Sequence, residues 1–272
     1  MTPAAVSHQI KSLEEKLGTL LFHRLTRSLR LTEAGRQALP ALTEGFTRLN
    51  DAVDQMRSYS EGGLLTISVS PSFGTMWLVP KLDRFRAMHP NIEIRLDGTD
   101  RLVDISRDET DVAVRYGLGN YEGVQVDFLF HQRNTPVCSP ALLAGEFPLR
   151  TPQDLCNHTL LHVDWKDADA SWHMWLLAAG VENTNPAKGP HFNQEAMAVQ
   201  AALDGQGVAL IGDRLIADHL RAGSLVCPFA PYVSTPLNFA YHLISPKNYT
   251  VRPKVSAFRD WLLAETQFDD KK

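Results

Sequence analysis

The sequence predicts an α/β protein that begins with a basic, largely helical segment, and three patterns support this prediction. From residue 65 onward, short stretches of alternating apolar residues are followed repeatedly by stretches with helical periodicity. Residues 1–36 instead indicate a helix, a basic hairpin and a second helix. Between these regions, apolar residues repeat in heptads over residues 39–56, which is typical of a helix that pairs with another helix.

The composition excludes several classes of protein. Charged residues make up 21% of the 272 residues and hydrophobic residues 44%, which is typical of a folded globular chain. No apolar run approaches a membrane span and no signal peptide is evident, so we expect a cytoplasmic protein without a membrane partner. Cys138, Cys156 and Cys227 match neither a disulfide framework nor a zinc site, and we expect no metal and no cofactor.

The charge is distributed unevenly along the chain. Residues 1–36 carry six basic and three acidic residues, a balance of +3, whereas the remainder carries 21 basic and 28 acidic residues, a balance of −7. A basic end on an acidic body favours nucleic acid as the partner of that end. On charge alone, an ordinary solvated surface explains the balance equally well.

The first predicted helix has one polar and one apolar face. Thr2 suits the N-cap and Pro3 the first helical position. The apolar face would carry Val6, Ile10, Leu13 and Leu17, and the polar face Ser7, His8, Lys11 and Ser12. Because the polar face has no obvious partner within the chain, it is a candidate for contact with another molecule.

The segment after this helix strengthens the nucleic-acid interpretation. Two short extended pieces flank a turn at residues 26–28, with Arg24, Arg27 and Arg30 spaced along them. Thr32 can then cap a new helix, with Glu33 in its first turn. Helix, basic hairpin and helix describe the back half of a winged helix-turn-helix, in which the helix enters the major groove and the hairpin cations reach phosphates.

The stretch TPAAVSHQIKSLEEKLGTLLFHRLTRSLRLTEAG resembles the DNA-binding end of LysR-type transcriptional regulators, in the branch that includes the glycine-cleavage-system activator. The stretches LVPKLDRFRAMHPNIEIRL, DVAVRYG and AALDGQGVALIGDRLIADHLRAG extend the resemblance to about residue 263. The resemblance implies a two-lobed effector domain like a periplasmic binding protein, with strands crossing between the lobes near 134–138 and 232–240. It also implies assembly as a homodimer or homotetramer.

One departure from the family concerns the N-terminus. Family members carry a first helix and most of a second before the position of Thr2, so we expect this sequence to be truncated relative to the family. A late start codon, a genuine truncation and a shortened chain remain open as explanations. Without those helices, the apolar face of the first helix would lack its support, and we expect weak, salt-sensitive DNA binding with little sequence preference from the 272-residue form.

Three regions follow from these patterns. Residues 1–37 form a partial winged helix-turn-helix and residues 38–61 a linker and dimerisation helix. Residues 62–272 form the effector-binding domain, with lobe I at about 62–135 and 241–272 and lobe II at about 136–240. The heptad seam of the linker comprises Leu39, Leu42, Phe46, Leu49, Val53 and Met56. A single amphipathic helix lying on its own domain is the alternative for so short a seam.

Within the effector domain, the elements alternate. In lobe I we expect strands at 65–69, 91–96 and 111–117, a helix over 70–88, and a short helix through residues 102 and 105. Beyond residue 140 we expect helices near 172–179, 194–203, 213–223 and 255–266, and strands at 208–212 and 237–245. This alternation predicts parallel sheets with right-handed crossovers.

Ligands of open α/β lobes bind outside the carboxyl ends of the strands, often at helix N-termini. This rule selects Ser70, Ser72, Phe73, Thr99, Asp100, Arg115, Asn193 and Gln194 as effector-binding residues. Hydroxyl groups with one cation would suit a small polar or anionic effector. Alternatively, the two serines only cap their helix and Arg115 forms a surface ion pair. In the related branch, small hydroxyl residues more often occupy the position of Gln194 and Glu195, so the effector cannot be transferred by analogy.

The sequence therefore predicts a ligand-responsive regulator that binds promoter DNA, with RNA polymerase as a further candidate partner. The DNA-contacting residues would be Thr2, Pro3, Ser7, His8, Gln9, Lys11, Arg27 and Arg30. The alternative is a small-molecule binding module that does not bind DNA. No nucleophile elbow, dinucleotide fingerprint or metal-binding helix motif occurs, so we expect no enzyme and no catalytic residues.

Overall fold

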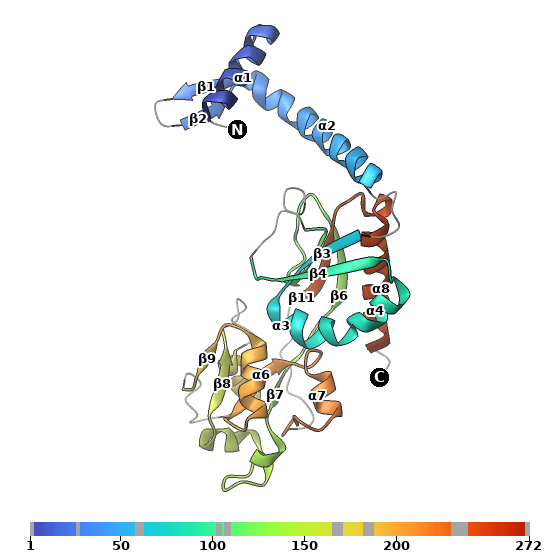
Figure 1. Ribbon diagram of the computed structural model, residues 1–272. Helices are drawn as coiled ribbons and strands as arrows, with labels where there is room; N and C mark the ends of the chain where they lie inside the picture. Colours follow the sequence, from blue (N-terminus) through green and yellow to red (C-terminus); the bar gives the residue numbers. More distant parts are fainter. Residues whose placement is uncertain are drawn as a thin grey trace. The chain divides into compact units, whose positions relative to one another are not determined.

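The computed structural model describes residues 3–25, 28–57, 63–101, 105, 110–164, 171–181, 188–229 and 239–269. The chain divides into two units, Met1–Tyr59 and Ser60–Lys272, and each is described by itself (Figure 1). Among the helices of the described ranges, none is long and apolar enough to cross a membrane.

The N-terminal unit has the predicted order of helix, hairpin and helix. Helix α1 (Pro3–Leu17) ends at Gly18, whose positive φ of 63° stops the helix. Strands β1 (Phe22–Leu25) and β2 (Ser28–Leu31) pair in antiparallel register, and helix α2 (Glu33–Arg57) follows. The predicted elements of this unit are therefore confirmed.

Two buried polar side chains hold this small unit together. Glu14 Oε1 accepts hydrogen bonds from the backbone amides of Leu21 (2.8 Å) and Phe22 (3.1 Å), which fixes α1 to the start of the hairpin. Thr32 donates to the Leu20 carbonyl (2.7 Å) and accepts from the Gly35 amide (3.1 Å). The second bond is the N-cap that the sequence predicted for α2.

Helix α2 is one continuous element that spans the predicted boundary between residues 37 and 38. Pro40 lies inside it, in its second turn. The seam side chains that the structure describes are exposed, with Leu39 at 49%, Leu42 at 54%, Phe46 at 66% and Leu49 at 63%. The side chains of Val53 and Met56 lie outside the described part. The described seam therefore does not lie on its own unit, contrary to the alternative weighed from the sequence.

The C-terminal unit contains two sheets, one in each lobe. The lobe I sheet has the order β4-β3-β5-β11-β6. Its strands are β3 (Gly63–Val69), β4 (Ile92–Gly98), β5 (Val112–Gly117), β6 (Gln125–Phe130) and β11 (Ala240–Ser245). Strand β3 runs parallel to β4 and β5, whereas β11 runs antiparallel to β5 and β6.

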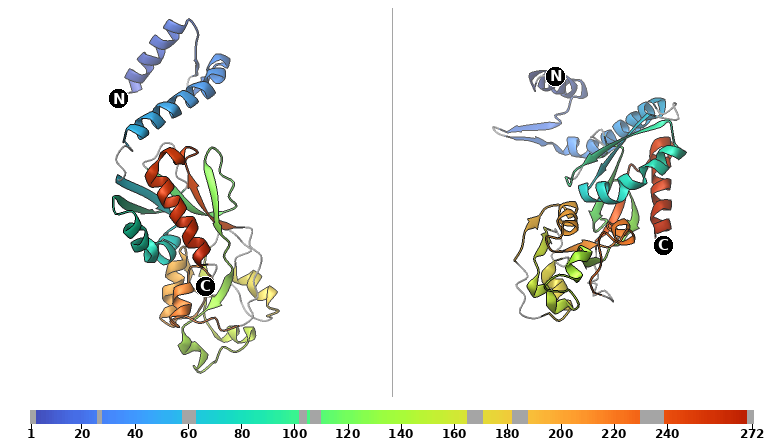
Figure 2. Two further views of the ribbon diagram at one scale, coloured as in Figure 1. Left: turned by 90° about the vertical axis from the view of Figure 1, so that its right-hand side faces the viewer. Right: turned by 60° about the horizontal axis from the view of Figure 1, so that its bottom comes forward.

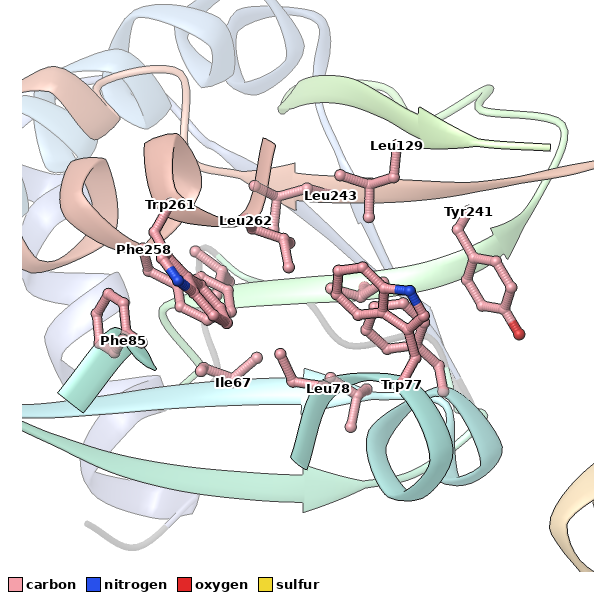
Figure 3. Close-up of a cluster of buried hydrophobic side chains, with 14 of the residues drawn as sticks. Ile67, Trp77, Leu78, Phe85, Leu129, Tyr241, Leu243, Phe258, Trp261 and Leu262 are labelled. Carbon is pink, nitrogen blue, oxygen red and sulfur yellow. The ribbon is translucent and has the colours of Figure 1, made fainter. Parts of the chain in front are cut away.

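One face of the lobe I sheet carries an aromatic core. Helix α4 (Leu82–Met88) and helix α8 (Pro253–Asp269) cover this face, and their rings meet where Phe85 lies edge-on to Phe258 (Figure 3). The predicted helix over 70–88 is confirmed in segments. Helix α3 (Pro71–Phe73) leads into a π-helical stretch over Gly74–Leu78 and a 3-10 turn over Val79–Lys81 before α4 begins.

Lobe II is built on a four-stranded sheet of order β7-β10-β8-β9. The strands are β7 (Asn134–Val137), β8 (Leu160–Val163), β9 (His191–Phe192) and β10 (Val208–Gly212). The helices are α5 (Trp172–Ala178), α6 (Glu195–Leu203) and the short α7 (Ala217–Arg221), with 3-10 turns at Pro140–Leu143 and Pro152–Asn157. A further 3-10 turn, Tyr249–Val251, precedes α8 of lobe I.

The lobes contact each other through α3 and α6, which Figure 2 shows side by side. Met76 packs against both lobe cores, and Leu215 of the segment after β10 belongs to the lobe I core. The chain passes from β6 of lobe I to β7 of lobe II through residues 131–133. This crossing lies slightly earlier than predicted, and most of the expected second crossing at 232–240 lies outside the described residues.

The prediction of parallel sheets is only partly correct. Strands β3, β4 and β5 are parallel, as are β8, β9 and β10, but β7 and β11 run against their neighbours. Both antiparallel strands adjoin a passage between the lobes, so they enter their sheets from the opposite end. The expected helix through residues 102 and 105 lies mostly outside the described ranges; Ile105 itself lies in a turn.

Candidate DNA-binding surface and effector site

The polar face of α1 is exposed. Ser7, His8 and Lys11 lie in solvent, as does Gln9 at the edge of this face, whereas Ser12 is half-buried. Lys11 Nζ lies 3.9 Å from Glu15 Oε1 with both side chains 68% exposed. A pair so exposed contributes little to stability, so Lys11 can exchange this partner for a phosphate.

The hairpin supplies one described basic side chain beside α1. Arg30 on β2 is exposed and faces His23 of β1 across the ladder. Pro3 is the first residue of α1, but its side chain is not among those described, and Thr2 and Arg27 lie outside the described ranges.

The apolar face of α1 is also exposed. Val6 is 40%, Leu13 47% and Leu17 56% exposed, while Ile10 is half-buried. The helix thus presents apolar side chains on one face and polar side chains on the other.

The predicted effector residues meet where α3 of lobe I approaches α6 of lobe II. The Ser72 hydroxyl donates to Gln194 Oε1 (3.3 Å) and accepts from the Ala196 amide (3.2 Å). Gln194 Nε2 donates to Asp100 Oδ2 at 2.7 Å. Ser72, Asp100 and Gln194 therefore form one hydrogen-bonded chain across the two lobes, and Ser72 of lobe I caps a helix of lobe II.

The remaining predicted residues of lobe I have different roles. Ser70 precedes α3, but its side chain forms no capping bond and lies beside the Tyr241 hydroxyl. The Thr99 hydroxyl accepts from the Arg101 amide (3.2 Å) and stabilises the turn after β4. Phe73 is fully buried and stacks on Trp77 at 5.0 Å, so it belongs to the core and does not line a ligand site. In lobe II, Asn193 is exposed.

Arg115 does not take the position that the sequence predicted. Its side chain leaves β5 on the same face as Ser68 of β3, away from the aromatic core. Its NH2 group donates to the Ser68 hydroxyl (2.7 Å) and to the Arg101 carbonyl (2.9 Å), and NH1 donates to the Val114 carbonyl (2.9 Å). Arg115 therefore supports the segment that carries Asp100, and most of its hydrogen-bonding capacity is already used by protein acceptors.

Sequence reasoning missed three buried polar residues beside this site. Glu195 is 4% exposed in the first turn of α6, and Gln132 is 2% exposed in the crossing between the lobes. Tyr241 on β11 is 2% exposed and lies beside Glu195. Burial raises the pKa of Glu195 to about 8, and the negative charge of Asp100 acts in the same direction. The sequence held one usable signal, since Glu195 begins a helix whose other residues, except Gln200, are apolar.

An exposed polar helix beside a basic hairpin, in a chain that also carries a two-lobed α/β unit, defines a DNA-binding regulator with an effector domain. The comparisons with known families agree with this class. Residues 59–267 match the model of the LysR substrate binding domain, and residues 1–36 match that of the bacterial regulatory helix-turn-helix protein of the lysR family. The chain belongs to the LysR family of transcriptional regulators.

Curated relatives resemble the chain along its whole length. It is 42% identical over 275 residues to the glycine cleavage system transcriptional activator of Escherichia coli K12, covering 100% of this chain and 88% of the relative. It is 37% identical over 264 residues to the HTH-type transcriptional activator AmpR of Pseudomonas aeruginosa, covering 97% of this chain and 86% of the relative.

Solved structures support the same fold. The effector domain of AmpR from Pseudomonas aeruginosa matches with a TM-score of 0.63 and 33% identity, covering 77% of this chain and 98% of that domain. CrgA, a LysR-type regulator from Neisseria meningitidis, matches with a TM-score of 0.61 over 98% of this chain and 90% of its own. Because its identity to this chain is only 23%, the second match supports the fold alone.

Proposed function

We propose that this LysR-family regulator reads promoter DNA with the polar face of α1 and senses a small metabolite between the lobes of its C-terminal unit. The observation that carries the first half is the exposed row of Ser7, His8, Gln9 and Lys11. In winged helix-turn-helix proteins, residues in the first turns of such a helix reach base edges. Pro3, the first residue of this helix, and Thr2, which precedes it in the sequence, belong to this proposed surface.

On the hairpin, Arg27 and Arg30 would contact phosphates and fix the register on the duplex. Of these two residues, Arg30 is the one that the structure describes; its side chain is exposed and forms no ion pair with another described residue.

We further propose that α2 pairs with its copy through the exposed seam, so that a dimer or tetramer binds a pseudo-palindromic site. We place the protein in the cytoplasm, where its promoter DNA lies.

For the effector, we propose the region where Ser72, Asp100 and Gln194 join the two lobes. These three side chains belong to both lobes, so a ligand that replaces their mutual bonds changes the contact between the lobes. Such a change can be transmitted to the DNA-binding ends as a change of spacing or angle.

A gel-shift experiment tests the DNA-binding half. The full chain is titrated onto the promoter fragment upstream of its own gene and onto a scrambled fragment of the same length, at low and at physiological salt. We expect weak binding with little preference for the promoter fragment, which falls steeply between low and physiological salt, and a Lys11→Ala variant should bind more weakly at low salt. Absence of binding at low salt, in the wild type as in the variant, would leave the alternative of a binding module without a DNA-reading function.

A further inference from the structure

Three polar side chains from different elements meet near Gly212, at the end of β10. The Gly212 amide donates to Glu195 Oε1 at 3.4 Å. The Gln132 amide group lies against the Gly212 Cα, where a Cβ would overlap it. Tyr241 reaches the same place from lobe I: its ring packs in the lobe I core, and its hydroxyl points away from that core (Figure 3).

Gln132 is held firmly in this position. Its neighbour Arg133 donates through its backbone amide to Asp213 Oδ1 and through Nε to Asp213 Oδ2, both at 3.0 Å. The Asp213 amide donates back to the Arg133 carbonyl at 2.9 Å. Yet Gln132 is only 2% exposed, and neither atom of its amide group has a hydrogen-bond partner. Because buried amides are almost always hydrogen-bonded, both polar atoms of this one are available to a bound molecule.

Glu195 also lacks a counter-charge. It is 4% exposed and forms no ion pair with a basic side chain of the described residues. The groups that face it are the Gly212 amide, the Tyr241 hydroxyl and the negative charge of Asp100. Arg214, two residues after Gly212, lies over the Phe130 ring at 5.4 Å. Because burying an unpaired charge is costly, a buried carboxyl group either stays protonated or faces a cation.

We propose that Glu195, Gln132 and Tyr241 form a subsite for the protonated amino group of the effector. The inference rests on the proposed function, because it requires an effector that binds between the lobes. An ammonium group supplies one positive charge and three N–H donors, which match the Glu195 carboxylate, Gln132 Oε1 and the Tyr241 hydroxyl oxygen. Gln132 Nε2 then needs an acceptor on the same ligand. The effector is therefore a small amine with an oxygen acceptor beside its amino group, as in an α-amino acid or an amino alcohol.

This subsite has a thermodynamic signature. Without ligand, burial keeps the pKa of Glu195 near 8, so the carboxyl group is largely protonated at pH 7. An ammonium group beside it favours the carboxylate, so Glu195 releases its proton when the amine binds. Binding at pH 7 should therefore release close to one proton, which calorimetry detects as a dependence of the binding enthalpy on the ionisation enthalpy of the buffer.

The test uses the full chain and matched pairs of probes. A thermal-shift panel compares α-amino acids with their α-hydroxy acid counterparts, for example alanine with lactate, and ethanolamine with ethylene glycol. The best amine is then measured by calorimetry in phosphate and in MOPS, two buffers of different ionisation enthalpy that carry no primary amine. We expect thermal shifts from amines only, a loss of affinity of about tenfold or more in Glu195→Gln, and no proton release by that variant. Gln132→Met should weaken binding as well, and Glu93→Gln, an exposed carboxylate on β4, is the matched control.

The outcomes separate this inference from the proposed function. Equal shifts from hydroxy acids and amines, shifts from no amine, or unchanged affinity in both Glu195→Gln and Gln132→Met overturn the amine subsite. Those results say nothing about DNA binding, because the gel-shift experiment tests DNA binding independently. Circular dichroism verifies that each variant is folded; should Glu195→Gln fail to fold, Gln132→Met alone decides.

Discussion

Ser72 is a lobe I residue whose hydroxyl caps a lobe II helix. Replacing it by alanine leaves the Ala196 amide without an acceptor and removes the donor to Gln194. We expect Ser72→Ala to lower the free energy of unfolding of the C-terminal unit by about 0.5–2 kcal/mol. Urea unfolding of the full chain, followed by the fluorescence of the tryptophans, measures this loss. Thr75→Ala, at an exposed position nearby, is the control, and equal stability of the two variants would contradict the capping role.

Glu195 makes the stability of the C-terminal unit depend on pH. The folded chain keeps the Glu195 proton up to a pKa of about 8, whereas the unfolded chain releases it near 4.5. Between these values the folded state binds more protons, so its stability falls as the pH rises, by up to about 1.4 kcal/mol for each pH unit.

The variant Glu195→Gln has no proton to release at this position. Its free energy of unfolding should therefore rise relative to wild type as the pH increases from 5 to 8. Urea unfolding at several pH values measures the difference, and Glu93→Gln provides the comparison with an exposed carboxyl group. A difference between Glu195→Gln and wild type that stays constant with pH would show that the Glu195 carboxyl group is ionised throughout.

Single residues show why the candidate site was only partly predictable. The rule about strand ends selected Ser72, Asp100 and Gln194, which lie in one hydrogen-bonded chain, because the rule depends on topology, which the alternation of elements reveals. It also selected Arg115 but could not reveal its bonds to Ser68 and the Arg101 carbonyl, since the direction of a side chain depends on which face of the sheet becomes core. It missed Gln132, because burial at a crossing between lobes leaves no local pattern in the sequence.

At the scale of elements, Glu14 joins α1 to the hairpin. Its carboxylate accepts two backbone bonds and is 6% exposed. Glu14→Ala leaves the amides of Leu21 and Phe22 without acceptors, at a cost of about 1–3 kcal/mol. We expect faster hydrogen exchange at these two amides, measured by NMR or mass spectrometry. Glu15→Ala changes an exposed neighbour on the same helix and is the control. Equal hydrogen-exchange rates at the two amides in both variants would show that Glu14 does not fix α1 to the hairpin.

Helix α2 offers the clearest test of assembly. Leu49 is 63% exposed in the seam, and a charge at this position would face its copy across a paired helix. We expect light scattering of Leu49→Asp to give a smaller assembly than that of the wild type. Arg48→Ala, which removes an exposed ion pair with Glu44, should keep the wild-type mass.

An unchanged mass for Leu49→Asp would have two readings, because the C-terminal units alone could hold copies together. Repeating the measurement at decreasing protein concentration separates them, since loss of one interface raises the protein concentration at which the larger assembly dissociates. Identical dissociation curves for Leu49→Asp and Arg48→Ala would show that the seam is not an interface.

At the scale of the whole molecule, periodicity in the sequence was sufficient to predict two kinds of unit and nearly all described helices. Local patterns do not encode strand direction, and this is why the prediction of parallel sheets was only partly correct. Strands β7 and β11 adjoin passages between the lobes, and their antiparallel pairing follows from where the chain enters each sheet. The same passages place Gln132 and Tyr241 beside Glu195. The cluster of these three buried polar side chains is therefore a consequence of the two-lobed topology.

The DNA-binding function can be divided into two physical contributions. If Arg30 contacts a phosphate, Arg30→Ala should weaken binding to all DNA fragments and reduce the slope of log K against log salt concentration by about 1. If His8 reads a base edge, His8→Ala should instead remove the small preference that the wild type has for the promoter fragment, with the salt slope nearly unchanged. Arg221→Ala removes an exposed arginine of α7 and should alter neither quantity. Fluorescence anisotropy over a series of salt concentrations measures both. A loss of preference in Arg30→Ala together with a changed slope in His8→Ala would reverse the two roles and place the hairpin, not α1, against the bases.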